Sequence, residues 1–511
     1  MPENLILNLV ILAQIIKELF TSPGTGFIPG IKLGNFRYFF LAIFFLGSYA
    51  HSVALSESAI YFRCHSQFVR SRPPAGDELL ASIKAGKLTA TEACLQLLSE
   101  SNLDHTGKPK KELQPDDRGL QILRTFQAFH MTWFPNKELV RQETEILTAN
   151  IYDSNEMGYH LTFNLFGDDT SYSEIVTRPT SFRGVRYAPR PGTHLLEPDN
   201  DGRFPLLADK KWNLFTEDSL SKTWTPQFIE TGKLVGLRPL TAEENYVRMS
   251  ASKKKVPKGQ KLEFSASASL GAGILGTAPY LLLNSHESTK FIDGGLVMHR
   301  GWSKAVFSDL LCRSLPVLRK EDVAYTIQKE SHLPFRKSET CMQCHSTIDP
   351  AASTVRQVTV VKLLGVDKAV NSPRMMGMFD VTEAPEIELP DSDEQYYLRP
   401  PQGRLNFRNY KGELVDQKLS GLKDLGVALA QSDDLYLCAA KRYFEFMTGV
   451  NVEIGDFTTD DFANVSQEEL GYRNFVINLG LNLKKHQSLK KMIQEIISSP
   501  IYRKSDYGIV L

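Results

Sequence analysis

The chain has 511 residues, of which 42% are hydrophobic, and its 59 Lys and Arg residues are balanced by 59 Asp and Glu residues. This length is sufficient for two to four domains with apolar cores. Proteins that bind nucleic acid carry an excess of basic residues, so the neutral balance predicts no nucleic-acid partner.

The N-terminal segment has the features of a secretion signal. Lys32 and Arg37 precede an apolar run over residues 38–50, which is too short to span a bilayer but suits a signal peptide. A small-x-small cleavage site ends at Ala54. We expect cleavage near Ala54, a periplasmic or otherwise exported mature protein, and membrane contact only through the N-terminal segment. A second apolar stretch at residues 5–16 leaves open a two-segment anchor or a translation start near Lys32.

Most of the mature chain shows helical periodicity, with apolar residues recurring at three- and four-residue spacing. Thr89-Ala-Thr-Glu92 has the spacing of a capping box, which begins a helix. Residues 178–261 are rich in Pro, Gly, Thr and Asp, and are predicted to be irregular before a strand over 262–270. Helices are predicted over residues 76–85, 89–101, 116–134, 138–151, 300–311, 422–447 and 481–498.

We therefore predict a mainly α, multi-helix exported protein with irregular loops, little β structure and a C-terminal helical cytochrome-c-like haem region. The expected regions are an N-terminal extension and signal peptide (1–54), a helical N-terminal domain (55–160), a mixed helix and loop middle region (161–330) and the C-terminal helical c-type haem region (331–511). His130 lies in the aromatic stripe of the 116–134 helix, and we predict a hydrogen-bonded core histidine there rather than an iron ligand.

The segment Cys341-Met342-Gln343-Cys344-His345 is a CxxCH motif, the pattern that attaches haem c. The two thiols form thioethers with the haem vinyl groups, and the histidine binds the iron. With 6 Cys and 11 His in 511 residues, chance would produce this pattern only about 0.0015 times. The sequence predicts one covalent haem c with its iron, held by Cys341, Cys344 and His345, in an electron-transfer protein with an unknown redox partner in the cell envelope.

Other interpretations of the motif remain open. A zinc site would need two more ligands at short spacing, and the chain has no second CxxC and no HxxxH. A redox dithiol would follow a strand in a βαβ unit, whereas residues 334–340 are polar and loop-like. Whether the protein is an enzyme is also open. A haem-dependent oxidoreductase or peroxidase would need an open sixth coordination position, and an envelope binding protein with an auxiliary haem would explain the long chain before the motif.

The sixth iron ligand of an electron carrier is usually Met or His. Three methionines lie on an expected turn around Gly377, which has the conformational freedom to bring a side chain over the haem. We rank Met378 first; an upstream histidine such as His299 or His332, or an open position, are the alternatives. The methionine candidates are Met375, Met376 and Met378.

Four cysteines remain outside the motif, and an even number in an exported protein is typical of two disulfides. Three pairings are conceivable, and four free thiols are the alternative. We predict Cys64–Cys94, because these residues are close in sequence around the first helix of the 76–101 hairpin. We also predict Cys312–Cys438, because this pair would close a loop around the haem motif.

Several segments, in order along the chain, resemble exported proteins of planctomycete and myxobacterial type that join domains of unknown function to a C-terminal CxxCH segment. The resemblance implies haem binding, export and electron transfer, but it supplies no substrate. Two features depart from that family: Ala-Ala-Ser follows the motif's Ile-Asp-Pro where Gly-Phe is usual, and Phe379-Asp380 comes later than expected. The segments that carry the resemblance are residues 172–177, 273–276, 299–312, 341–350, 379–380, 425–449 and 488–503.

Overall fold

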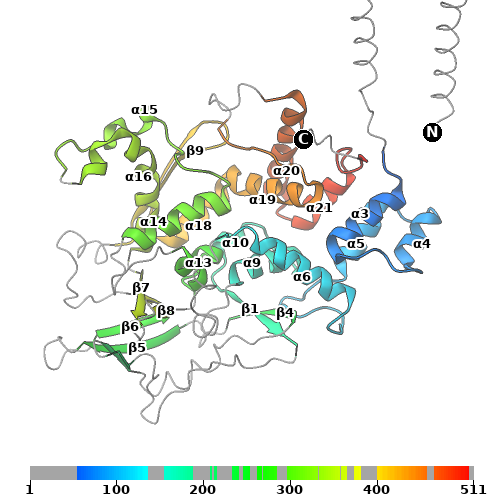
Figure 1. The fold of residues 1–511 in the computed structure, drawn as a ribbon, viewed down its shortest axis with the longest axis horizontal. Coiled ribbons are helices and arrows are strands. Elements are labelled where there is room, and N and C mark those ends of the chain that lie inside the picture. The colour runs from blue at the N-terminus through cyan, green and yellow to red at the C-terminus, as the bar shows by residue number, and fades with distance from the viewer. Residues whose placement is uncertain are drawn as a thin grey trace, which may run out of the picture. The chain divides into compact units, whose positions relative to one another are not determined.

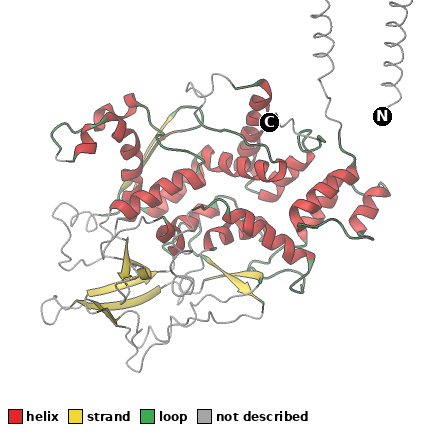
Figure 2. Cartoon of the chain, viewed as in Figure 1, coloured by secondary structure: helices red, strands yellow, loops and turns green. Residues whose placement is uncertain are grey.

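A computed structural model describes the protein over residues 54–135, 155–187, 208–209, 212–215, 233–240, 246–253, 262–267, 269–284, 296–331, 333–356, 358–364, 373–380, 400–456 and 465–505. Residues 54–511 form one compact unit and residues 1–53 another. The predicted signal peptide, except Ala54, and the predicted 138–151 helix lie outside the described residues. Helices predominate in the described part of the larger unit (Figures 1 and 2), which confirms the mainly α prediction.

The described chain begins with three helices, α3 (Glu57–Val69), α4 (Glu78–Lys84) and α5 (Ala90–Ser99). The last two confirm the predicted hairpin with slightly shorter bounds. The capping box is present as predicted, since the Thr89 and Glu92 side chains each bond the other's backbone N–H. α3 was not predicted. It packs against α5, and the two helices are joined by a disulfide between Cys64 and Cys94, whose Cα atoms are 6.2 Å apart.

His130 is a core histidine, as predicted. It lies on α6 (Arg118–Met131), which packs against α9 (Glu156–Phe166), and its side chain is fully buried. Nδ1 lies 2.8 Å from the Thr162 hydroxyl and Nε2 lies 2.7 Å from the Tyr443 hydroxyl. Thr162 donates its own hydrogen to Gly158 O, so it accepts from Nδ1–H, and Nε2 accepts from Tyr443. Burial lowers the pKa of His130 to about 3.

The middle of the chain contains sheets that the sequence analysis did not predict. β1 (Phe182–Arg186) pairs antiparallel with β4 (Leu234–Pro239). A second sheet has six antiparallel strands in the order β2-β3-β5-β6-β8-β7, and of these only β6 was predicted. These strands up to residue 253 lie in the 178–261 segment, which was predicted to be irregular because it is rich in Pro, Gly, Thr and Asp; the pairing of β6 with β8 joins segments far apart in the chain. The bounds are β2 Ala208–Asp209, β3 Trp212–Phe215, β5 Tyr246–Lys253, β6 Leu262–Ser267, β7 Val358–Leu364 and β8 Pro373–Asp380.

Two predicted C-terminal helices are each divided in two. The 422–447 segment forms α18 (Leu422–Gln431) and α19 (Asp433–Thr448), because Ser432 is extended and its hydroxyl caps α19. The 481–498 segment spans the end of α20 (Gln467–His486) and α21 (Leu489–Ser498), and Gln487 between them has a positive φ of 60°. The remaining elements are α10 (Glu174–Thr177), α13 (Ala278–Leu283), α14 (Leu296–Ala305), α15 (Lys320–Val323), α16 (Glu339–Ala352), β9 (Gly403–Arg408) and β10 (Leu414–Leu419).

One large apolar core connects these elements. Its buried side chains run from Ile60 on α3 to Tyr502 near the end of the described chain. Residues from all three ranges expected after the signal peptide, 55–160, 161–330 and 331–511, contribute to it. The backbones of α18 and α10 approach closely at Gly426, where an added Cβ would lie 2.0 Å from Val176 O.

Candidate haem-attachment site

The CxxCH motif forms the first turns of α16, which lies beside α14, α15 and β9 (Figure 1). Ser338 caps this helix, and its hydroxyl accepts from the Cys341 backbone N–H at 3.4 Å. Residues at i, i+3 and i+4 share a helix face, so Cys341, Cys344 and His345 lie on one side of α16. A 3-10 turn, Pro334–Lys337, precedes the helix, which is not the strand that a thioredoxin-like dithiol would require.

Both motif thiols are free, whereas the other four cysteines are paired. Cys341 is exposed and Cys344 is half-buried. Burial raises the pKa of the Cys344 thiol, and the neighbouring Cys341 raises it further. Cys312 is bonded to Cys438, with Cα atoms 5.2 Å apart, so both predicted disulfides are confirmed. The free thiols are therefore those that the haem prediction requires.

The motif histidine has one nitrogen engaged. His345 Nδ1 lies 3.2 Å from each carboxylate oxygen of Asp349, one turn later on α16. An ionised carboxylate only accepts hydrogen bonds, so Nδ1 donates its hydrogen to Asp349. Within the described residues, Nε2 makes no hydrogen bond. Nε2 is therefore the ring nitrogen left available for iron, while a carboxylate orients the ring through Nδ1.

Asp349 is held by a second partner from another helix. Arg300 on α14 donates from Nε to Oδ1 at 2.6 Å and from Nη2 to Oδ2 at 2.8 Å. Burial acts to raise the pKa of Asp349, but the hydrogen bonds from His345 and Arg300 outweigh it and leave that pKa below its usual value. The sequence analysis did not single out either residue, although the four-residue spacing from His345 to Asp349 was a usable signal.

The helix that carries the motif is fixed by apolar and polar contacts. Met342 packs in a small cluster with Leu318 and Val323, which also contacts Phe335. The Thr326 and Ser346 hydroxyls are 2.9 Å apart, and the Asn406 side chain on β9 donates to Ser346 O at 3.3 Å. These contacts leave Cys341 exposed while anchoring the opposite side of α16.

The predicted turn around Gly377 is wrong. Gly377 lies in β8 and pairs with Val361 of β7 in extended conformation, because this segment completes the six-stranded sheet. The three methionines lie on this strand, and their side chains are outside the described part. His332 also lies outside the described residues. His299 is fully buried on α14, the helix that packs against α16.

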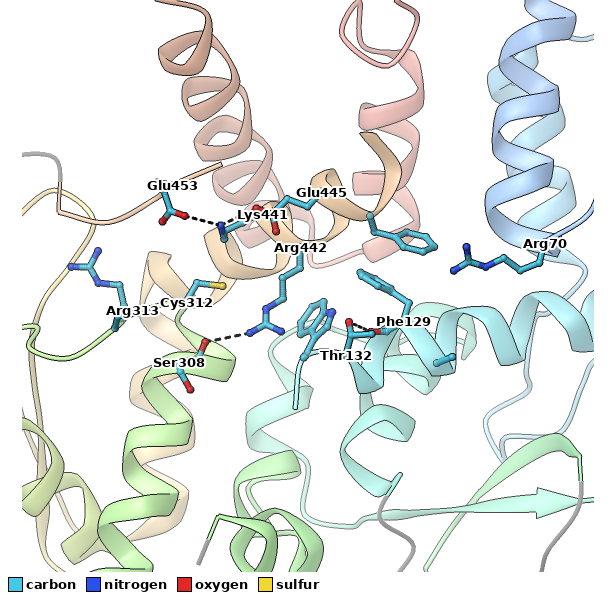
Figure 3. A pocket seen from close by; sticks show the side chains of 14 residues that line it. Arg70, Phe129, Thr132, Ser308, Cys312, Arg313, Lys441, Arg442, Glu445 and Glu453 are labelled. Atoms are coloured by element: carbon cyan, nitrogen blue, oxygen red, sulfur yellow. Dashed lines mark hydrogen bonds and ion pairs between the residues drawn. The ribbon is translucent and has the colours of Figure 1, made fainter. Parts of the chain in front are cut away.

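A separate pocket of about 680 Å³ lies beside α19 (Figure 3), and α16 contributes no residue to its lining. Arg442 reaches into it, with its guanidinium 5.0 Å from the centre of the Trp133 ring and one N–H donating to Ser308 O at 3.2 Å. Burial lowers the pKa of Arg442. Neighbouring Lys441 is instead paired with Glu445 at 2.8 Å. The lining comes from four distant segments, so no local pattern indicated this pocket.

Within the described ranges, no group of three or more His, Cys, Asp or Glu side chains is arranged to hold a metal ion. No helix in the described part of the chain is long and apolar enough to cross a membrane. Comparisons with models of protein families, with curated proteins and with solved structures find no match to this chain.

Proposed function

We propose that the protein is an exported mono-haem c-type cytochrome that transfers electrons. Cys341 and Cys344 hold the haem covalently and His345 binds its iron. The observation that carries this proposal is the combination of two free thiols and a histidine with an available Nε2 on one face of α16. When bound, haem supplies a one-electron redox couple at a permanently retained position.

The surroundings of each residue in the site indicate its proposed role. Exposed Cys341 is accessible for thioether formation, and Cys344 follows it by one helical turn. Asp349 accepts a hydrogen bond from His345 Nδ1 and so orients the imidazole. Arg300 donates two hydrogen bonds to Asp349 and so orients its carboxylate. His299 or a methionine of β8, with Met378 ranked first, is the proposed sixth ligand.

Export is part of the same proposal. Residues 1–54 would act as a signal peptide cleaved near Ala54, which delivers residues 55–511 to the periplasm or the cell envelope. Two disulfides favour an oxidising compartment. The resemblance of the motif's flanking segments to exported CxxCH proteins points the same way.

Covalent haem tests the proposal directly. The protein, expressed in a host with haem c maturation machinery, should retain haem on a denaturing gel. Cys344→Ser should lose most of this staining, whereas Cys94→Ser, which removes a cysteine outside the motif, should keep it. Wild-type protein without covalent haem would show that the proposal is wrong.

A second candidate function is an envelope binding protein in which haem is auxiliary. The pocket beside α19 favours it, because no carboxylate in the described residues forms an ion pair with Arg442 and an aromatic wall lies alongside. Such a site suits a small aromatic anion. Benzoate should raise the melting temperature of wild-type protein but not of Arg442→Gln, and neutral benzyl alcohol should affect neither. Equal effects of benzoate on both proteins would exclude this site.

A further inference from the structure

Four side chains around the motif histidine form a closed ring of contacts. His345 donates a hydrogen bond to Asp349, and Arg300 donates two hydrogen bonds to the same carboxylate. Phe335 completes the ring: its side chain stacks on His345 with ring centres 4.2 Å apart and lies 5.2 Å from the Arg300 guanidinium. The four side chains come from α14, the turn before α16 and α16 itself. The imidazole is therefore fixed in both tautomer and orientation.

The two charged members of this ring have opposite effects on the imidazole. A carboxylate that accepts Nδ1–H makes the ring a stronger electron donor at Nε2. Stronger donation stabilises oxidised iron and lowers the reduction potential. Arg300 places a positive charge on the same carboxylate, which weakens the pull of Asp349 on the Nδ1 hydrogen.

We propose that Asp349 and Arg300 are positioning residues that set the reduction potential of a haem bound at His345. Asp349 lowers this potential, and Arg300 limits the lowering. The inference rests on the proposed function, since it requires haem at Cys341 and Cys344. It goes beyond that function because it assigns the tuning of the iron to a half-buried ion pair contributed by two helices.

The test is the midpoint potential of haem-loaded protein, measured by spectroelectrochemistry. Asp349→Asn should raise the potential, and Arg300→Gln should lower it. We expect each substitution to change the ratio of reduced to oxidised haem at a fixed applied potential by about tenfold, which is 59 mV for a one-electron couple. Asp349→Glu keeps a carboxylate and should fall between Asp349→Asn and the wild type.

Glu339→Gln is the matched control for charge alone. It removes a carboxylate from the first turn of the same helix, with no hydrogen bond to His345. Its shift should be much smaller than that of Asp349→Asn. A shift of equal size would mean that charge, and not the hydrogen bond, sets the potential, and the inference would be wrong.

The remaining outcomes separate this inference from the proposed function. Shifts of the same sign in Asp349→Asn and Arg300→Gln would indicate a loosened site and overturn the inference alone, as would unchanged potentials in fully loaded variants. Absence of covalent haem from the wild type would overturn both. If Asp349→Asn fails to load haem, the sign of the shift in Arg300→Gln decides the inference.

Discussion

Cys312, which follows the π-helical turn Val306–Leu310 after α14, is bonded to Cys438 in the middle of α19, and 126 positions separate them in the sequence. Their bridge closes a loop that contains the whole of α16. Cys64 and Cys94 close a much shorter loop, with a separation of 30.

The two disulfides close loops of different length, so they should contribute differently to the free energy of unfolding. In the chain-entropy description, the longer loop stabilises the folded state by about 5 kcal/mol and the shorter one by about 4 kcal/mol. The paired replacement Cys312→Ala/Cys438→Ala should therefore cost about 1 kcal/mol more than Cys64→Ala/Cys94→Ala. Urea denaturation of the two variants measures this difference. A larger loss from the shorter loop would contradict it.

Stability should depend on pH through His130. Burial lowers the pKa of His130 from 6.5 in the unfolded chain to about 3 in the folded protein. The contribution of neutral His130 to the free energy of unfolding is therefore fully present above pH 6.5, and it is lost as the pH falls towards 3. His130→Gln removes this dependence. The free energy of unfolding of the wild type, relative to the variant, should fall by about 3 kcal/mol between pH 7 and pH 4.

Denaturant curves for both proteins at a series of pH values test this dependence, and parallel curves would contradict it. The comparison must be relative, because Asp309 and Asp434 act in the opposite sense. Burial raises the pKa of each to about 6. The contribution of these two protonated carboxyl groups to the free energy of unfolding is therefore fully present below the pKa of an unfolded Asp, and it is lost as the pH rises towards 6.

Two helical glycines should respond oppositely to alanine. Gly426→Ala would place a Cβ 2.0 Å from Val176 O, and it should cost more than about 1 kcal/mol by forcing α18 away from α10. Gly471 on α20 has no atom within 4 Å of such a Cβ. Gly471→Ala should instead stabilise the protein by about 0.5–1 kcal/mol, because alanine favours the helix. Thermal unfolding of both variants decides the prediction, and similar losses would show that the approach at Gly426 is not tight.

Carbon monoxide distinguishes a carrier from a haem enzyme. If a side chain occupies the sixth position, as we expect for an electron carrier, the reduced spectrum should not change when CO is added. His299→Ala should create CO binding if His299 is the sixth ligand, and Met378→Ala should do so if that methionine is. Strong CO binding by the wild type would favour the oxidoreductase or peroxidase alternative.

Local patterns predicted the start of α5 and the Cys64–Cys94 pair. The capping box at Thr89 needs only four consecutive residues, and Cys64 and Cys94 are close in the chain. The six-stranded sheet was missed because β6 pairs with β8 across more than a hundred residues, at Ser265 with Asp380. The break at Ser432 was missed because the apolar period continues through it.

The sequence predicted the contiguous part of the candidate site but not the contact between its two helices. Cys341, Cys344 and His345 form a contiguous signature, so the sequence alone indicated them. Asp349 follows His345 at a helical spacing, but its importance depends on Arg300, which is 49 positions earlier. That contact exists only because α14 and α16 pack together, and nothing in the local sequence specifies their packing.

The first and last described segments of the large unit contact one another. Leu55 N–H donates to Arg503 O at 2.8 Å, Arg503 forms an ion pair with Glu57, and Arg63 donates to Tyr502 O. During synthesis, α3 therefore emerges long before the residues that complete its surroundings. If the chain is exported from its N-terminus, residue 341 enters the new compartment before this closure can form. The motif thiols are then accessible to any attachment machinery while α3 still lacks the contacts that residues 502–503 provide in the folded protein.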